Sequence, residues 1–406
     1  MRIATLQFAP KLGDVEGNIK RANDLLGKQN FTGLQESSSQ ELSGRGDIDF
    51  LRPDLLVLPE LAFTGYNFTS REAIEPFLEQ VGDGPSAQWA REIARRLHCK
   101  VCVGYPEIEH SSDGSGSPKY YNSLLVVDES GSVIHNYRKS FLYMTDETWA
   151  TEGDVALGLC QLPFPSVGSS EIPENRSQLH REDSGPRRQV ATSFGICMDI
   201  NPYKFEAPYS AYEFANRARD SGSQLVVLSM AWLTHMSQQE MTDLRGRPDM
   251  DTFTYWLNRF MPLISKKMRH VGDIDGSSAS TENGVKRAVL VFANRAGEEA
   301  GADDTKPVAR YAGTSTIMAL TQNPRKAAAG ARSASGSPEK RPAAMIDPEE
   351  ASEDEDEEVD TQVVCWDLLG AAEEGICFAD TTAVPKMAFR LRSRGGQSDS
   401  DEMSDQ

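Results

Sequence analysis

Three polar residues stand directly after apolar, strand-like runs, and their side chains could act together. Glu60 follows DLLVLP, Lys139 follows GSVIHNYR, and Cys197 follows ATSFGI. The ends of strands are where α/β folds place their sites, because the sheet is rigid and the loops beyond it are free to vary. Taken singly, each residue has a plainer interpretation, as a packing cysteine, a turn glutamate and a solvated lysine. The prediction of a site depends on the three contexts occurring together.

A thiol, a carboxylate and an ammonium suffice to hydrolyse an amide in two steps. An amide is a poor electrophile, so the route through a thioester is easier than direct attack by water. The carboxylate of Glu60 would take the proton of Cys197, return it to departing ammonia and then activate water. The ammonium of Lys139 and the backbone N–H of Met198 would stabilise the oxyanion. We therefore expect no metal and no organic cofactor.

The elements that position these residues are short apolar runs alternating with amphipathic helical patterns. Strands alternating with helices indicate an α/β fold whose sheets are covered by helices. Strands are predicted at 2–9, 54–59, 100–105, 122–128, 131–137, 189–196, 224–230, 287–293 and 314–320. Helices are predicted at 15–27, 86–97, 208–221 and 252–266.

Four polar segments interrupt this pattern. Three of them, 28–48, 166–188 and 268–285, are rich in serine, glycine and charge, which is typical of surface insertions. The fourth, about 323–360, is predicted to be disordered, because it has too few apolar residues to offset the entropy of ordering. The folded pattern resumes at 363–380, so we expect one domain over 1–385 and a flexible tail over 386–406.

The net charge of −19 comes mainly from the end of the chain. Residues 347–360 hold ten acids and no base, residues 397–406 hold four more acids, and without both the net charge is −5. No broad basic surface predicts nucleic-acid binding, and no apolar run approaches the roughly 18 residues of a membrane span. The start lacks the pattern of a signal peptide, and six scattered cysteines make no disulfide framework. We expect a cytoplasmic protein; nuclear presence stays open.

Three stretches of the chain resemble the signature blocks of the nitrilase superfamily: LPELAFTGYNF, YRKSFLY and GICMDINPY. The resemblance implies a four-layer α-β-β-α sandwich in which Glu60 is the general base, Lys139 the oxyanion stabiliser and Cys197 the nucleophile. It also implies a second glutamate eight residues beyond the lysine, which is Glu147, to orient Lys139 and the amide. Members of the family commonly pair through helix faces, so a homodimer and a monomer are both open.

One branch of this superfamily matches further. TGYNF, YRKSFLYMTDE and ICMDINPYKFEAP resemble the fungal protein N-terminal amidases. That resemblance implies a polypeptide substrate whose first residue is Asn or Gln, hydrolysed to Asp or Glu with release of ammonia in an N-terminal degradation pathway. Two alternatives stay open: a small-molecule amidase or carbamoylase of the same superfamily, and a non-enzymatic protein that binds a basic partner through its acidic loop.

Such a substrate carries a free α-ammonium, which requires a carboxylate near the amide site. The candidates are Asp146, Asp199 and Glu206, although Asp199 would serve equally as a cap for the turn that follows it. Three aromatic or amide side chains are expected to line the pocket, although the aromatic ones would also suit a core. They are Tyr66, Asn67 and Trp232.

Overall fold

The computed structural model describes residues 1–27, 48–111, 116–165, 187–244, 246–269, 284–300, 308–323 and 359–390. Most of the three predicted insertions and almost all of the predicted disordered segment lie outside these residues, as does the end of the chain from 391. None of the helices in the described part is long and apolar enough to cross a membrane.

The first large sheet carries the amino-terminal half of the described chain. Its strand order is β14-β1-β2-β3-β4-β5. β1 and β2 run parallel, as do β2 and β3, while β14 pairs antiparallel with β1 from the far end of the sequence. The bounds are β1 (Arg2–Gln7), β2 (Leu55–Val57), β3 (Lys100–Glu109), β4 (Lys119–Val127), β5 (Val133–Arg138) and β14 (Gly375–Asp380).

The second large sheet has the order β15-β13-β12-β9-β8-β7-β6, with β7, β8 and β9 parallel at its centre. Its strands are β6 (Leu159–Pro165), β7 (Arg187–Ile196), β8 (Leu225–Met230), β9 (Lys286–Asn294), β12 (Thr316–Gln322), β13 (Thr361–Leu368) and β15 (Met387–Arg390). A separate two-stranded hairpin joins β10 (Glu298–Glu299) to β11 (Ala309–Arg310).

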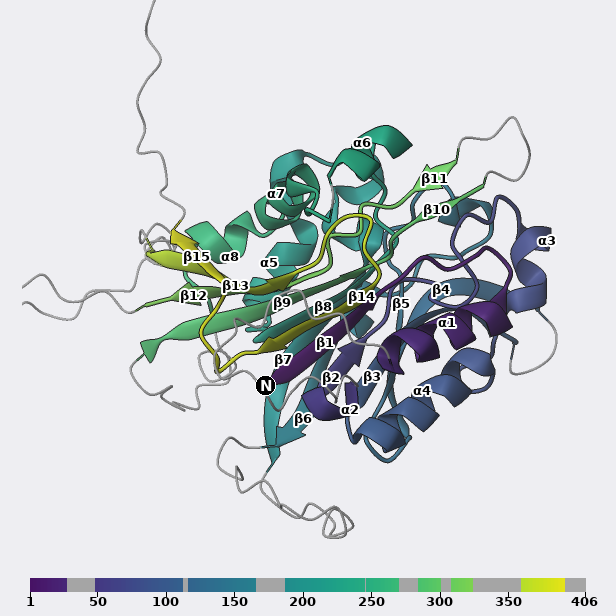
Figure 1. The fold of residues 1–406 in the computed structure, drawn as a ribbon, viewed down its shortest axis with the longest axis horizontal. Helices are drawn as coiled ribbons and strands as arrows, with labels where there is room; N and C mark the ends of the chain where they lie inside the picture. Colours follow the sequence, from purple (N-terminus) through teal and green to yellow (C-terminus); the bar gives the residue numbers. More distant parts are fainter. Residues whose placement is uncertain are drawn as a thin grey trace, which may run out of the picture.

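Helices cover the outer faces of both sheets (Figure 1). α1 (Val15–Gly27) and α4 (Pro85–Leu97) pack on the first sheet through one buried apolar cluster. α5 (Glu213–Asp220), α7 (Met250–Asn258) and α8 (Met261–Ser265) cover the second sheet, and their apolar residues belong to the cluster that also fills the space between the sheets. Shorter helices are α2 (Ile48–Leu51), α3 (Arg71–Ile74) and α6 (Gln238–Asp243). The predicted α-β-β-α sandwich is confirmed.

Three predicted boundaries differ from the structure. The predicted helix over 252–266 is two helices, because Pro262 stands in the first turn of α8, where its missing N–H is tolerated only at a helix start. The predicted helix over 208–221 begins only at Glu213. The predicted tail begins too early, because Val363 of β13 pairs with Phe389 of β15. The domain therefore extends at least to Arg390.

Candidate active site

Each of the three residues predicted to do chemistry follows a strand. Glu60 lies three residues beyond β2, Lys139 directly follows β5, and Cys197 directly follows β7. The first two belong to one sheet and Cys197 to the other, so the site forms where the two sheets face each other. The thiol of Cys197 lies close enough for the charges of Glu60 and Lys139 to act on its pKa. The structure thus brings together the three residues.

Glu60 is fully buried, and both of its carboxylate oxygens are held. Oε2 accepts a hydrogen bond from the backbone N–H of Ala231 at 2.8 Å, just beyond β8. The Glu60 loop lies directly against β3 at Gly104, where an added Cβ would stand 2.8 Å from the Cα of Glu60. Glycine is thus required in β3 for the carboxylate to reach this position.

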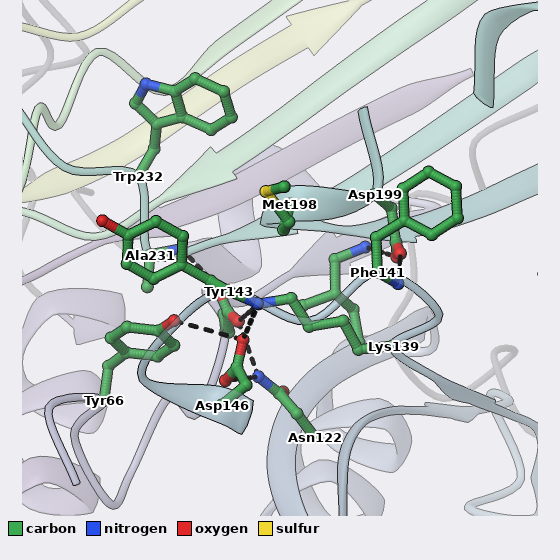
Figure 2. A network of polar contacts seen from close by, with 12 residues as sticks. Tyr66, Asn122, Lys139, Phe141, Tyr143, Asp146, Met198, Asp199, Ala231 and Trp232 are labelled. Atoms are coloured by element: carbon green, nitrogen blue, oxygen red, sulfur yellow. Dashed lines mark hydrogen bonds and ion pairs between the residues drawn. The ribbon is translucent and has the colours of Figure 1, made fainter. Parts of the chain in front are cut away.

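One ammonium and one amide group join two carboxylates into a closed ring. Lys139 Nζ donates to Glu60 Oε1 at 2.6 Å and to Asp146 Oδ2 at 2.5 Å. Asn122 Nδ2 donates to the same two side chains, at 2.7 Å and 3.0 Å. Figure 2 shows Lys139, Asn122 and Tyr66 converging on Asp146. A ring of this kind fixes the direction of every member, because each acceptor has donors on both sides.

The electrostatics of the ring favour a protonated lysine beside a carboxylate that is ready to accept a proton. Burial alone would lower the pKa of Lys139, but Asp146 and Glu60 outweigh burial and hold its pKa above the ordinary value. Burial raises the pKa of Glu60, while Lys139 opposes that shift and Asp146 adds to it. A carboxylate whose pKa is raised toward neutrality is a better general base than an ordinary one.

Cys197 begins a short 3₁₀ turn (Cys197–Ile200) and has φ of 41°, in the left-handed region that side chains other than glycine rarely adopt. Surrounding bonds stabilise this strained backbone. The carboxylate of Asp199 accepts from the N–H of Ile196 at 2.7 Å and from that of Phe141 at 2.8 Å. Arg259 Nε donates to the carbonyl of Ile200 at 2.6 Å. The turn is therefore fixed at both ends.

The thiol of Cys197 is held in its protonated form in this site. Burial, followed by the negative charge of Glu60, raises its pKa well above the ordinary value, and Lys139 only partly offsets this. Because a thiolate and not a thiol attacks carbonyl carbon, the proton must be removed during the reaction. Glu60 is the buried carboxylate whose charge acts most strongly on this thiol.

A pocket of about 640 Å³ opens onto Cys197. Aromatic residues form much of its wall, among them Tyr66, Tyr143, Trp232 and Tyr255. Its lining also includes three carboxylates, Glu240, Asp249 and Asp251, and no lysine or arginine among the described residues. Such a lining suits a substrate that carries a positive charge beside its reacting group. Nowhere in the described part do three or more histidine, cysteine or acidic side chains gather as metal ligands would.

The residues predicted to line the pocket divide into two groups. Tyr66, Met198 and Trp232 line it, Met198 directly beside the nucleophile. Asn67 is not among the described lining residues; its side chain donates to the carbonyl of Ala300 at 3.0 Å. Asn67 therefore supports the loop behind the pocket wall.

The predicted roles of the acidic residues differ from the geometry. Glu147 is exposed, and the neighbouring Asp146 takes the position on Lys139 that was expected of it. Asp146 is thereby occupied and is not free for a substrate ammonium. Asp199 is fully buried among backbone N–H groups and the hydroxyl of Tyr137, at 2.8 Å, so it acts as a cap. Glu206 is exposed and is not among the described residues that line the pocket.

Four contributors to the site were missed by sequence reasoning. Asn122 had a signal, because an amide near the start of the apolar run YNSLLVV is a buried polar group that needs partners. The backbone N–H of Ala231 had none, since its role depends only on where β8 ends. The acids of the pocket, Asp249 and Asp251, are brought to the site by the start of α7, far along the chain from the three signature stretches.

Comparisons with known proteins agree with this fold and place the chain in a family. Residues 2–177 match the carbon-nitrogen hydrolase family. The protein N-terminal amidase of Schizosaccharomyces pombe is 33% identical over 335 residues, which cover 79% of this chain and 92% of that protein. The protein N-terminal amidase of Saccharomyces cerevisiae is 33% identical over 237 residues, 58% of this chain and 46% of that protein.

Solved structures give the same architecture. A crystal structure of N-terminal amidase with an Asn-Glu-Ala peptide has a TM-score of 0.60 at 22% identity and covers 97% of this chain and 99% of its own. One with a Gln-Val peptide has a TM-score of 0.60 at 21% identity with the same coverage. At these identities the structural likeness bears on the fold alone.

Proposed function

Since this chain belongs to the carbon-nitrogen hydrolase family, we propose that it hydrolyses the side-chain amide of an asparagine or glutamine at the N terminus of a polypeptide. The observation that carries the proposal is the pocket at Cys197, which combines the buried ring of Glu60, Lys139 and Asp146 with an acidic outer wall. The two relatives named as protein N-terminal amidases support the choice of substrate.

In the first half of the proposed reaction, the substrate amide is converted to a thioester. Glu60 takes the proton from Cys197 Sγ, and the thiolate attacks the amide carbon. The oxyanion is stabilised by the ammonium of Lys139 and by the backbone N–H of Met198. Glu60 then passes its proton to the amide nitrogen, the carbon–nitrogen bond breaks, and ammonia leaves. The acyl group stays on sulfur.

In the second half, water releases the product. Glu60, again a carboxylate, removes a proton from water as the water oxygen attacks the thioester carbon. The second oxyanion uses the same two donors. When it collapses, the carbon–sulfur bond breaks and Cys197 regains its proton from Glu60. The product is the aspartate or glutamate side chain. Asp146 keeps Lys139 charged and in place.

The carboxylates of the acidic wall explain why the substrate would need a free N terminus. An α-ammonium lies a few bonds from the reacting amide, so it reaches the lining beyond Cys197. Asp249 accepts from the N–H groups of Asp251 and Thr252, both at 3.1 Å, and caps α7. Asp251 is exposed beside it. Because these bonds occupy Asp249, we assign the ammonium to the two exposed carboxylates of the wall, Asp251 and Glu240, where a cation keeps part of its water.

The test compares peptides that differ only at their N terminus. Ammonia release is measured from an Asn-initiated and a Gln-initiated peptide, from their N-acetylated forms and from free asparagine. We expect turnover of the two free peptides, and at least about a hundredfold lower kcat/KM after acetylation, because acetylation removes the charge and adds bulk at the acidic wall. Cys197→Ala should abolish all release.

Other outcomes would redirect or end the proposal. If free asparagine and acetylated peptides react as fast as the free peptides, the chain is a small-molecule amidase of the same family. If ammonia release survives in Cys197→Ala, the nucleophile is wrong. As part of the same proposal, the enzyme acts in the cytoplasm and commits its substrates to N-terminal degradation. The lifetime of an Asn-initiated reporter protein in cells that lack the enzyme tests this part: it should be longer than in cells that have the enzyme.

A further inference from the structure

Glu299 lies outside the ring at Lys139, yet it holds one wall of the pocket. It is 3% exposed and belongs to β10 of the small hairpin. Its carboxylate accepts the backbone N–H of Tyr66, at 3.1 Å to Oε1 and 3.0 Å to Oε2, and that of Asn67 at 2.9 Å. A single side chain more than 230 residues away thus fixes two consecutive peptide groups of the loop that follows Glu60.

The loop is shaped to admit this carboxylate. Gly65 has φ of 82°, and a Cβ added there would stand 2.8 Å from Glu299 Oε1. The next residue, Tyr66, lines the pocket, and its hydroxyl donates to Asp146 Oδ2 at 3.3 Å. The Tyr66 ring also lies 5.6 Å from the ammonium of Lys139. The position of Tyr66 therefore affects both the pocket wall and the charged ring.

Buried partners hold the side chain of Glu299 in place. The hydroxyl of Tyr311 donates to Oε2 at 2.7 Å, and Arg295 Nη2 lies 3.1 Å from Oε1. Arg295 is itself fully buried, and its guanidinium lies 4.7 Å from the centre of the Tyr311 ring. A buried charge is retained only with such compensation. The two peptide N–H groups and the Tyr311 hydroxyl donate hydrogen bonds to this carboxylate, and the guanidinium of Arg295 pairs with it as an ion without donating one.

The hairpin that carries Glu299 also binds a second wall of the pocket, the stretch that includes Thr234 and Met236. The N–H of Thr234 donates to the carbonyl of Arg310 at 2.9 Å, and Arg310 Nη1 donates to the carbonyl of Met236 at 3.1 Å. Thr234 and Met236 line the pocket, on the same stretch as Trp232. The hairpin of β10 and β11 is thus bonded to both walls, and Figure 1 shows it at the end of the sandwich.

We propose that Glu299 is a positioning residue that acts through Tyr66 and sets the distance between the two walls of the pocket, and with it the fit of the substrate's first residue. This inference rests on the proposed function. Because asparagine and glutamine differ by one methylene, the spacing of the walls determines how each places its amide carbon at Cys197. Glu299 then affects selectivity between the two without touching either.

A double-mutant cycle tests whether Glu299 acts through Tyr66. The kinetic constants for Asn- and Gln-initiated peptides are measured for the wild type, Glu299→Gln, Tyr66→Ala and the double variant. The amide introduced by Glu299→Gln would turn a donor toward a backbone N–H. We expect KM to rise by about tenfold, kcat to fall less, and the Asn-to-Gln ratio of kcat/KM to change by about threefold or more. The double variant should be no worse than Tyr66→Ala.

Controls separate this role from a loss of stability. Glu92→Gln, an exposed change on α4, is expected to keep wild-type constants, and Tyr311→Phe removes only one bond to Glu299 and should give a smaller change in the same direction. Tyr311→Phe also serves if Glu299→Gln does not fold. The inference about Glu299 would be refuted, with the proposed function left standing, if the losses in the cycle were additive. An Asn-to-Gln ratio of kcat/KM that stayed unchanged in both Glu299→Gln and Tyr311→Phe would refute it in the same way. A wild-type chain that releases no ammonia from either peptide would refute the proposed function as well.

Discussion

Two carboxylates share the ammonium of Lys139, and the proposed chemistry requires them to behave differently. Asp146 is bonded to Lys139, Asn122, Tyr66 and the N–H of Tyr143, so its oxygens are occupied by donors that do not react. Glu60 shares two of those donors but is also the carboxylate that acts most strongly on the thiol. This division leaves Asp146 to neutralise the lysine and Glu60 to move protons.

Asp146 and Glu147 are neighbours in the chain, so one substitution at each gives a matched pair of variants that tests the role of Asp146. Asp146→Asn should lower kcat by about a hundredfold or more, because the ammonium of Lys139 then pairs only with Glu60 and opposes the transfer of a proton to that carboxylate. It should also lower the free energy of unfolding by about 3 kcal/mol, since a buried charge loses a partner. Glu147→Gln, an exposed change one residue along, should alter kcat less than about twofold. Ammonia release and urea unfolding provide the measurements. If Glu147→Gln lowered kcat strongly and Asp146→Asn did not, Glu147 would belong to the site as predicted.

That Asp146 and not the predicted Glu147 bonds to Lys139 has a physical cause. Asp146 and Glu147 stand side by side in a 3₁₀ turn (Asp146–Thr148), where successive side chains point in different directions. Two adjacent acids leave the sequence no means of telling which one faces inward. The three reacting groups could be found because each follows a strand that apolar pattern alone identifies. Asp251 and Ala231 N could not, because tertiary packing alone brings them there.

At the scale of elements, the sequence pattern identified the strands at the centres of both sheets and missed the two edge strands of the second sheet. β2, β3, β8 and β9 are buried apolar runs, and all were predicted. β6 was missed because its sequence, LCQLPFP, includes two prolines, which are tolerated at the edge position that β6 occupies. β15 was missed because four residues next to a charged tail carry little pattern.

A titratable group that bonds to the first turn of α4 has an effect on stability that can be measured. Glu79 is buried and accepts from Ser86 N at 3.0 Å and from Ser86 Oγ at 2.6 Å. Burial raises the pKa of Glu79 to about 7 from 4.5, against the opposing effect of Ser86. Between these values the folded chain keeps a proton that the unfolded chain has released, so stability falls as pH rises through this window.

Glu79→Gln should remove that dependence. The amide keeps an acceptor and a donor for Ser86 but cannot ionise. Over pH 4.5 to 7, the unfolding free energy of the variant should rise relative to that of the wild type by about 2 to 3 kcal/mol. Urea unfolding of the two proteins at several pH values measures the difference, in which other titrating groups cancel. Parallel stability curves would mean that Glu79 is ionised in the folded state at every pH in the window.

For the whole molecule, charge is the property that sequence alone describes well. The chain has a net charge of −19, and the charged residues in the described lining of the pocket are Glu240, Asp249 and Asp251. A field of one sign over a concave site concentrates ligands of the opposite sign and speeds their association. Because the Lys139 ring is buried, dissolved salt screens this outer field far more than it screens the reacting groups. Charged residues later in the substrate should therefore change the rate at which the substrate associates with the enzyme, and not the rate of the chemical step.

Salt dependence of three Asn-initiated peptides tests this separation. One carries lysines, one glutamates and one neutral residues after the second position. At about 20 mM salt, kcat/KM of the basic peptide should exceed that of the acidic one by about tenfold, since steering changes association rates by that order or more. At about 0.5 M salt, where the screening length is roughly 4 Å, the ratio should shrink to about twofold. The neutral peptide should change little, and kcat should be nearly the same for all three. An equal response of the three peptides to salt would mean that the acidic charge of the chain is not felt at the mouth of the pocket.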